Sequence, residues 1–171
     1  MNQINILNYQ PVHQPIFESL SRVWIEQLFE MEPIDEWVLT NPEKAIIEPG
    51  GAILMASYDG TIAGTVALRK IDDHTFEITK MSVDPAFRRR GIAEALIYAS
   101  YRKAWKLGAT HIILYASNRS TGAAELYQKA GFQFMPIEKD VYKRADVKMG
   151  ISIEEAMRKY HQHVYAQLTN N

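Results

Sequence analysis

The residues best suited to chemistry lie in a basic stretch that ends at a glycine. An apolar strand ends at Val83, a turn with proline follows, and the arginines at 88–90 lead into a helix that opens at Gly91. Backbone N–H groups, the positive end of a helix dipole and cationic side chains together attract anions. The stretch predicts a site for a polyanion such as a pyrophosphate. The arginines by themselves would also fit a solvated basic turn.

The strand before this stretch, Thr75–Val83, changes its apolar pattern midway. Apolar residues occupy even positions up to Ile78 and odd positions from Met81 on, so the phase slips near Lys80. A slip of one residue predicts a β-bulge, which bends a strand and redirects its side chains. A strand buried on both faces is the alternative interpretation.

Glu77 places a carboxylate inside this apolar strand, between Phe76 and Ile78. A carboxylate held in an apolar setting beside a substrate is a candidate proton acceptor. The alternatives are an ordinary outward-facing strand residue or an ion-pair partner of Lys80. The residue is therefore a candidate general base, or a group that positions a water molecule.

Turn signals predict the elements around this strand. Asp59-Gly60 links two apolar strands and is a strong hairpin signal, so antiparallel strands lead into Thr75–Val83. A helix over 91–107 then connects it to a strand at His111–Ala116, and such a crossover predicts that these two strands are parallel. The other expected elements are strands at 2–7, Ala52–Tyr58, Thr61–Lys70, 132–136 and 146–151, and helices at 16–30, 32–37, 121–130 and from Ser152 on. The fold class is α/β with a mixed sheet and helices on both faces.

Composition narrows the classes of function. The chain has 171 residues with 47% apolar and 23% charged, which predicts one globular domain, and its net charge of −1 provides no general basic field for nucleic acid. The absence of cysteine excludes disulfides, thiolate zinc sites and a cysteine acyl intermediate. The histidines lack metal-ligand spacing, so we expect no metal. Without a signal peptide or a long apolar run, we expect a cytoplasmic protein with no membrane partner.

These residues resemble the GCN5-related N-acetyltransferase (GNAT) superfamily, in a bacterial-type, single-domain form. The acetyl-CoA loop of that family has Arg or Gln, two residues, Gly, one residue, then Gly or Ala, and it reads here Arg88-Arg89-Arg90-Gly91-Ile92-Ala93. A second family signature resembles Leu126-Tyr127-Gln128-Lys129-Ala130-Gly131-Phe132. The resemblance implies an acetyltransferase domain over 1–151, with 152–171 as a helical extension of the same domain. This extension either caps its own domain or contacts a second copy in a possible homodimer.

The resemblance also implies roles for individual residues. Tyr127 would lie near the thioester sulfur as general acid, or would only pack on an apolar face, and Glu77 occupies a place where family members can carry the base. An Asn often precedes the Tyr signature, and Asn118 is favoured for that place over Ser117 and Ser120. The implied cofactor-binding residues are Met81, Ser82, Val83, Arg88, Arg89, Arg90, Gly91, Ile92, Ala93 and Asn118, with the strand backbone on the pantetheine arm and the loop amides on the pyrophosphate.

The predicted function is N-acetyl transfer from acetyl-CoA, as co-substrate, to a primary amine by direct transfer in a ternary complex. The acceptor would be a small-molecule or peptide amine. Trp24, Phe29 and Trp37 lie where family members wall the acceptor site, although packing of helices on the sheet is the favoured explanation for them. The alternative is an acyl-CoA-binding sensor or scaffold without turnover. A candidate base and acid, Glu77 and Tyr127, favour an enzyme.

Overall fold

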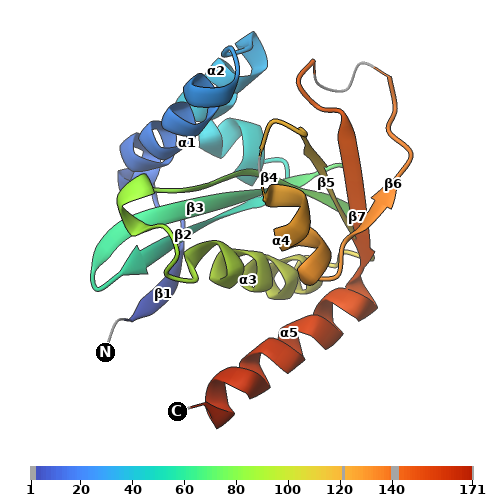
Figure 1. Ribbon diagram of the computed structural model, residues 1–171. Helices are drawn as coiled ribbons and strands as arrows, with labels where there is room; N and C mark the ends of the chain where they lie inside the picture. The colour runs from blue at the N-terminus through green and yellow to red at the C-terminus, as the bar shows by residue number, and fades with distance from the viewer. Residues whose placement is uncertain (1–2, 121, 140–142, 171) are drawn as a thin grey trace.

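A mixed β-sheet forms the centre of the computed structural model, which describes residues 3–120, 122–139 and 143–170. Within these residues the sheet has seven strands in the order β1-β2-β3-β4-β5-β7-β6 (Figure 1). Among the described residues only β4 and β5 pair in parallel, so the predicted mixed sheet and crossover are confirmed. Residues 2 and 121, where two elements were expected to begin, lie outside the described residues. The strands are β1 Ile4–Asn8, β2 Ala52–Tyr58, β3 Thr61–Lys70, β4 Thr75–Val83, β5 His111–Ala116, β6 Gln133–Met135 and β7 Val147–Ser152.

Helices cover both faces of the sheet, as Figure 1 shows. On one face lie α1 (Gln14–Leu28), α2 (Pro33–Thr40) and a π-helical turn (Glu43–Ile47), whose buried side chains form one apolar cluster with β2 and β3. On the other face α3 (Ile92–Lys106) packs with α4 (Ala123–Lys129) and α5 (Ile153–Thr169) in a second cluster. Short 3-10 turns cover Pro11–His13 and Pro85–Phe87. No helix in these stretches is long and apolar enough to cross a bilayer.

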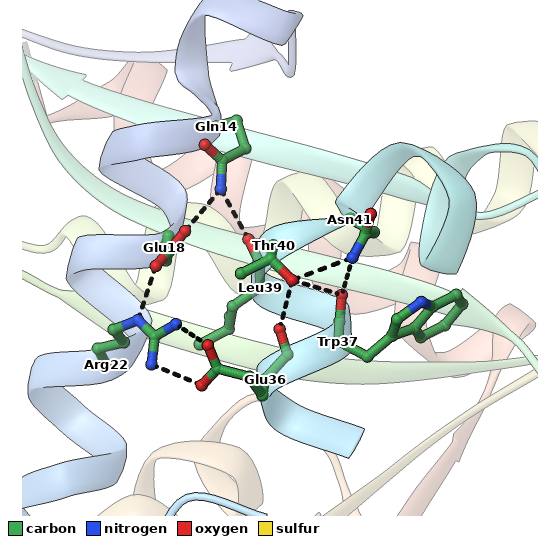
Figure 2. A network of polar contacts seen from close by, with 8 residues as sticks. All are labelled: Gln14, Glu18, Arg22, Glu36, Trp37, Leu39, Thr40 and Asn41. Carbon is green, nitrogen blue, oxygen red and sulfur yellow. Dashed lines mark hydrogen bonds and ion pairs between the residues drawn. The ribbon is translucent and has the colours of Figure 1, made fainter. Parts of the chain in front are cut away.

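A polar network holds α2 against α1 (Figure 2). Arg22 donates to Glu18 one turn earlier in α1 and, through two nitrogens at 2.8 and 2.5 Å, to Glu36 on α2. Gln14 donates to Glu18 and to the backbone carbonyl of Leu39. Exposed ion pairs of this kind add only about 0–1 kcal/mol each, so the network orients the two helices more than it stabilises them.

The C-terminal helix α5 packs along α3. Ser152 caps it as its sequence predicts, with its Oγ accepting a hydrogen bond from the Glu155 N–H at 3.2 Å. Ala156 is fully buried in the same apolar cluster as α3, so α5 packs against α3 of its own chain. The side chains of Tyr165 and Leu168 at the far end of this helix remain 69% and 72% exposed.

Candidate active site

The strand β4 contains a bulge at the place where its apolar pattern slips. Thr79 pairs with Ala67 and Ser82 pairs with Thr65, so two residues of β4 oppose only one residue of β3. One of the two, Lys80, has a φ of 51°, in the left-handed region that a residue with a side chain rarely adopts. The predicted bulge is therefore present and bends the strand.

Beyond the bulge, β4 and β5 separate. Their parallel pairing ends at Ile78 and Leu114, while β4 continues along β3 to Val83 and β5 continues along β7 to Ala116. Within the described residues, the later part of β4 has no strand partner on the side of β5. A narrow cavity of about 80 Å³ occupies this place and is lined by both strands, α4, the end of α1 and the segment before β7.

Glu77 lines this cavity as a nearly buried carboxylate. Its Oε1 accepts hydrogen bonds from the Arg69 Nη2 at 2.9 Å and Nε at 3.2 Å. The Glu77 side chain is 2% exposed, whereas that of Arg69 is 42% exposed and reaches water. These charge-assisted bonds offset the cost of burying the carboxylate. Lys80, the alternative partner considered from the sequence, makes its ion pair with Asp35 instead.

Tyr127 on α4 lines the same cavity and is half-buried. Its ring packs edge-on against Phe132, with centroids 5.8 Å apart. Burial raises the pKa of Tyr127 to about 12, so the phenol keeps its proton at neutral pH. That pKa lies above the value of about 8.5 for a cysteine thiol, so complete proton transfer from this phenol to a thiolate is unfavourable. The phenol is therefore better suited to donate a hydrogen bond to sulfur than to give up its proton entirely.

The basic loop at residues 88–93 leads into the start of α3 as predicted. Arg89 and Gly91 have positive φ values of 62° and 81°, and Gly91 is the N-cap of α3. The first N–H groups of the helix have no carbonyl partner within it and face outward at this end. All three arginines are exposed. The Arg90 guanidinium packs over the rings of Tyr58 and Phe87, at 4.9 and 5.4 Å from their centroids.

The strand residues expected to contact the pantetheine arm lie directly before this loop. Met81 and Val83 are half-buried and pack against the apolar cluster under α3, and Met81 also lines the cavity. Ser82 is buried, and its hydroxyl has no hydrogen-bond partner among the described residues. Ile92 is buried and Ala93 half-buried in the first turn of α3.

The turn after β5 presents serines, and not the favoured asparagine, to the cavity. Ser117 and Ser120 line it. Asn118 is exposed, and its backbone N–H donates to the Asp146 carboxylate at 2.9 Å. The cofactor contact assigned to Asn118 stays a prediction, and the two serines are nearer to the cavity wall.

Aromatic side chains from α1 and the following turn form part of the wall. Trp24 and Phe29 line the cavity, with ring centroids 5.7 Å apart. Trp37 lies elsewhere, beside a separate pocket, and is 47% exposed. Of the candidate aromatic wall, two residues thus reach the cavity.

Several lining residues carry no clear signal in the sequence. Lys80 and Arg144 both line the cavity and both bind Asp35 of α2. Tyr115 also lines it and donates from its hydroxyl to Glu138 at 3.0 Å. A lysine in an apolar strand is an unusual residue and could have drawn attention to Lys80. No local pattern distinguishes Arg144 from a surface arginine.

The arrangement suits acyl transfer from a long anionic carrier. One end offers helix N–H groups and arginines for phosphates, and the other offers a carboxylate and a phenol for proton handling. Among the described residues, no group of three or more His, Asp or Glu side chains is placed to hold a metal ion.

Known proteins share both the sequence pattern and the fold. Residues 14–132 match the model of the acetyltransferase (GNAT) family, a range that includes Glu77, Tyr127 and the basic loop but ends before Arg144. The chain is 30% identical over 136 residues to the uncharacterized N-acetyltransferase YvbK of Bacillus subtilis, which covers 75% of this chain and 88% of that protein. It is 36% identical over 92 residues to human N-acetylaspartate synthetase, covering 51% of this chain and only 29% of that longer protein.

Solved structures extend the likeness to the fold of 88% of this chain. A GNAT acetyltransferase from Staphylococcus aureus Mu50 superposes with a TM-score of 0.78 over 88% of this chain and 99% of its own, at 19% identity. The PaiA N-acetyltransferase of Thermoplasma acidophilum, solved in complex with coenzyme A, has a TM-score of 0.69 over 88% and 99%, at 18% identity. At this identity the likeness concerns the fold.

Proposed function

The chain belongs to the acetyltransferase (GNAT) family, and on that premise we propose that it transfers an acetyl group from acetyl-CoA to a primary amine within a ternary complex. The cavity between β4 and β5 is the observation that carries this proposal. It opens where the sheet separates at the bulge, and it has Glu77 and Tyr127 in its wall. The coenzyme A bound to the PaiA N-acetyltransferase supports the same cofactor for this chain.

In this proposal the cofactor runs from the start of α3 into the cavity. The amides of residues 88–93 and the exposed side chains of Arg88 and Arg89 hold the pyrophosphate. The backbone of Met81 and Val83, which lacks a partner strand on the β5 side among the described residues, bonds the pantetheine arm. The thioester then lies near the bulge.

The reaction needs no covalent enzyme intermediate. The amine nitrogen attacks the thioester carbon, a C–N bond forms, and the C–S bond breaks with its electron pair left on sulfur. Glu77 accepts the proton lost by the amine, directly or through a water molecule. Backbone N–H groups at the bulge stabilise the oxyanion. Tyr127 donates a hydrogen bond to the departing sulfur, and the thiolate takes its proton from solvent or from Glu77.

The test has a binding arm and a turnover arm. Acetyl-CoA should raise the melting temperature, while ATP at the same concentration should not; equal stabilisation by ATP would remove the cofactor assignment. A panel of small amines and peptides, assayed by release of free CoA, should then yield at least one acetylated product detectable by mass spectrometry. Tight acetyl-CoA binding with no product from any amine would instead favour a sensor or scaffold without turnover.

A further inference from the structure

Three charged side chains from distant parts of the chain meet beside the cavity. The carboxylate of Asp35 is fully buried, and it accepts from the Lys80 Nζ at 2.7 Å and from the Arg144 Nη1 and Nη2 at 2.7 and 2.8 Å. It also accepts from the backbone N–H of Glu32 at 3.0 Å. We refer to Asp35, Lys80 and Arg144 as the buried ion cluster.

Together with Glu32, the buried ion cluster is balanced in charge and well hydrogen-bonded. Arg144 also bonds Glu32 at 3.0 Å, so two cations face two carboxylates. Burial by itself would raise the pKa of Asp35, but the hydrogen bonds from Arg144 and Lys80 outweigh it and hold that pKa far below its ordinary value. Burial lowers the pKa of Lys80, and Asp35 opposes that shift. Asp35 therefore stays ionised at neutral pH.

The lysine of this cluster is also the strained residue of the bulge. A non-glycine residue in the left-handed region costs about 1–3 kcal/mol and persists only where its surroundings hold it. The Lys80 side chain is 6% exposed and is anchored on a carboxylate of α2, which is 45 residues away in sequence. The anchor ties the bent segment of β4 to the helical layer above it (Figure 1).

Arg144 connects the same Asp35 carboxylate to a second part of the cavity wall. Arg144 stands in the segment before β7, and its guanidinium lies 5.7 Å from the centroid of the Phe29 ring. Both residues line the cavity. One carboxylate thus connects the bulge, the aromatic wall and the segment before β7. A buried ion pair rarely stabilises a protein more than an apolar replacement would, so its location at the bulge points to a geometric role.

We propose that Asp35 is a positioning residue for acetyl transfer. Through Lys80 it holds the bulge that turns the backbone at Met81 toward the thioester, and through Arg144 it holds the wall against which the amine packs. This inference rests on the proposed function, because it concerns the geometry of that reaction.

The experiment compares Asp35→Asn with Glu36→Gln. The two residues are neighbours on α2, and both carboxylates bind an arginine, but Glu36 is exposed and does so in the network that links α1 and α2 (Figure 2). We expect Asp35→Asn to lower kcat by about 10- to 100-fold, because small displacements of reacting groups have effects of this size. The Kd of acetyl-CoA, set mainly at the distant loop, should change less than about twofold. Glu36→Gln should leave both constants within about twofold of wild type.

A second variant and a second measurement distinguish a local effect on the bulge from a general loss of folding. Lys80→Met removes the cation but keeps the volume of the side chain, and it should show the same fall in kcat with an unchanged Kd. Hydrogen exchange of the peptide containing residues 79–83 should be faster in Asp35→Asn than in wild type and unchanged in Glu36→Gln. A folded Asp35→Asn or Lys80→Met variant with wild-type kcat would overturn the inference.

Failure of the proposed function would look different. In that case the wild type itself would acetylate no amine. The inference about Asp35 would then be tested by hydrogen exchange alone. Unchanged protection at residues 79–83 in Asp35→Asn would then refute the claim that Asp35 holds the bulge.

Discussion

The basic loop at residues 88–93 and the cavity between β4 and β5, which are the proposed anion-binding end and the proposed acceptor end of the site, differ in how the chain builds them. The anion-binding end comes from one continuous stretch, residues 88–93, with a single glycine that starts a helix. The acceptor end takes side chains from α1, α2, β4, α4 and the segment before β7. The first end depends on local backbone geometry and the second on packing between elements. Binding of the cofactor and catalysis are therefore expected to respond to different substitutions.

The largest expected effect is that of Glu77→Gln, which should lower turnover without changing cofactor binding. Glu77→Gln keeps the shape of the side chain but cannot accept the amine proton, and it should lower kcat by about 100-fold or more. The Kd of acetyl-CoA, measured by calorimetry, should stay near that of wild type. Glu48→Gln, an exposed change, is the control. A wild-type kcat in Glu77→Gln would leave Glu77 as a structural partner of Arg69.

Tyr127→Phe should have the next largest effect. It removes one hydrogen bond to the departing sulfur, so kcat should fall by about 10- to 100-fold, while the Kd of acetyl-CoA stays near wild type. Because burial raises the pKa of Tyr127 to about 12, the rate should show no titration of this phenol between neutral pH and pH 9 in the wild type. The matched control is Tyr165→Phe on α5, where the side chain is 69% exposed. Equal kcat values for the two variants would remove Tyr127 from the mechanism.

At the anion-binding end we expect the opposite result, in which a substitution weakens cofactor binding and leaves turnover nearly unchanged. A side chain at Gly91 has room, since the nearest atom would be Ile4 Cδ1 at 3.9 Å, but the φ of 81° is unfavourable for alanine. Left-handed backbone costs an L-residue about 1–2 kcal/mol, so Gly91→Ala should shift the loop and weaken acetyl-CoA binding by about tenfold. Turnover at saturating cofactor should remain within about twofold of wild type.

Gly108→Ala is the matched control for this change. Gly108 has a φ of 88°, an open surrounding and a place at the other end of α3. It should lower the melting temperature without altering the Kd of acetyl-CoA. If the two alanine variants bind acetyl-CoA equally well, the anion site is not at Gly91.

The smallest expected effect concerns the acid stability of the acceptor end. The pKa of Asp35 is held well below its ordinary value of 3.8, so its contribution to stability is complete above that value and is lost as the pH falls toward the folded-state pKa. The melting temperature of the wild type should fall as the pH is lowered below about 4, and Asp35→Asn should show a shallower fall in that range.

Glu36→Gln provides the comparison for the acid melts. Arg22 lowers the pKa of Glu36 as well, but this carboxylate is exposed and screened by solvent. Its removal should flatten the curve less than removal of Asp35. Parallel curves for the wild type and Asp35→Asn would contradict the assigned ionisation of Asp35.

Much of the fold could be predicted because its signals are local. Asp59-Gly60 marked the hairpin, the phase slip near Lys80 marked the bulge, and Ser152 marked the start of α5. The site was predictable in part. Glu77 and Tyr127 do line one cavity, whereas the turn after β5 presents Ser117 and Ser120 in place of Asn118. The direction of a turn depends on its neighbours, here on the bond from the Asn118 N–H to Asp146.

The sequence by itself determined the strands, the parallel crossover and the helix N-terminus at Gly91, since periodicity, turn residues and helix starts act over a few residues. Only the tertiary structure decided the acceptor end. Lys80 could have paired with Glu77, three residues away, yet it binds Asp35 at a separation of 45 residues, and Arg144 binds Asp35 at a separation of 109. Each buried charge takes the partner that packing brings within hydrogen-bond distance, and no local pattern encodes that choice.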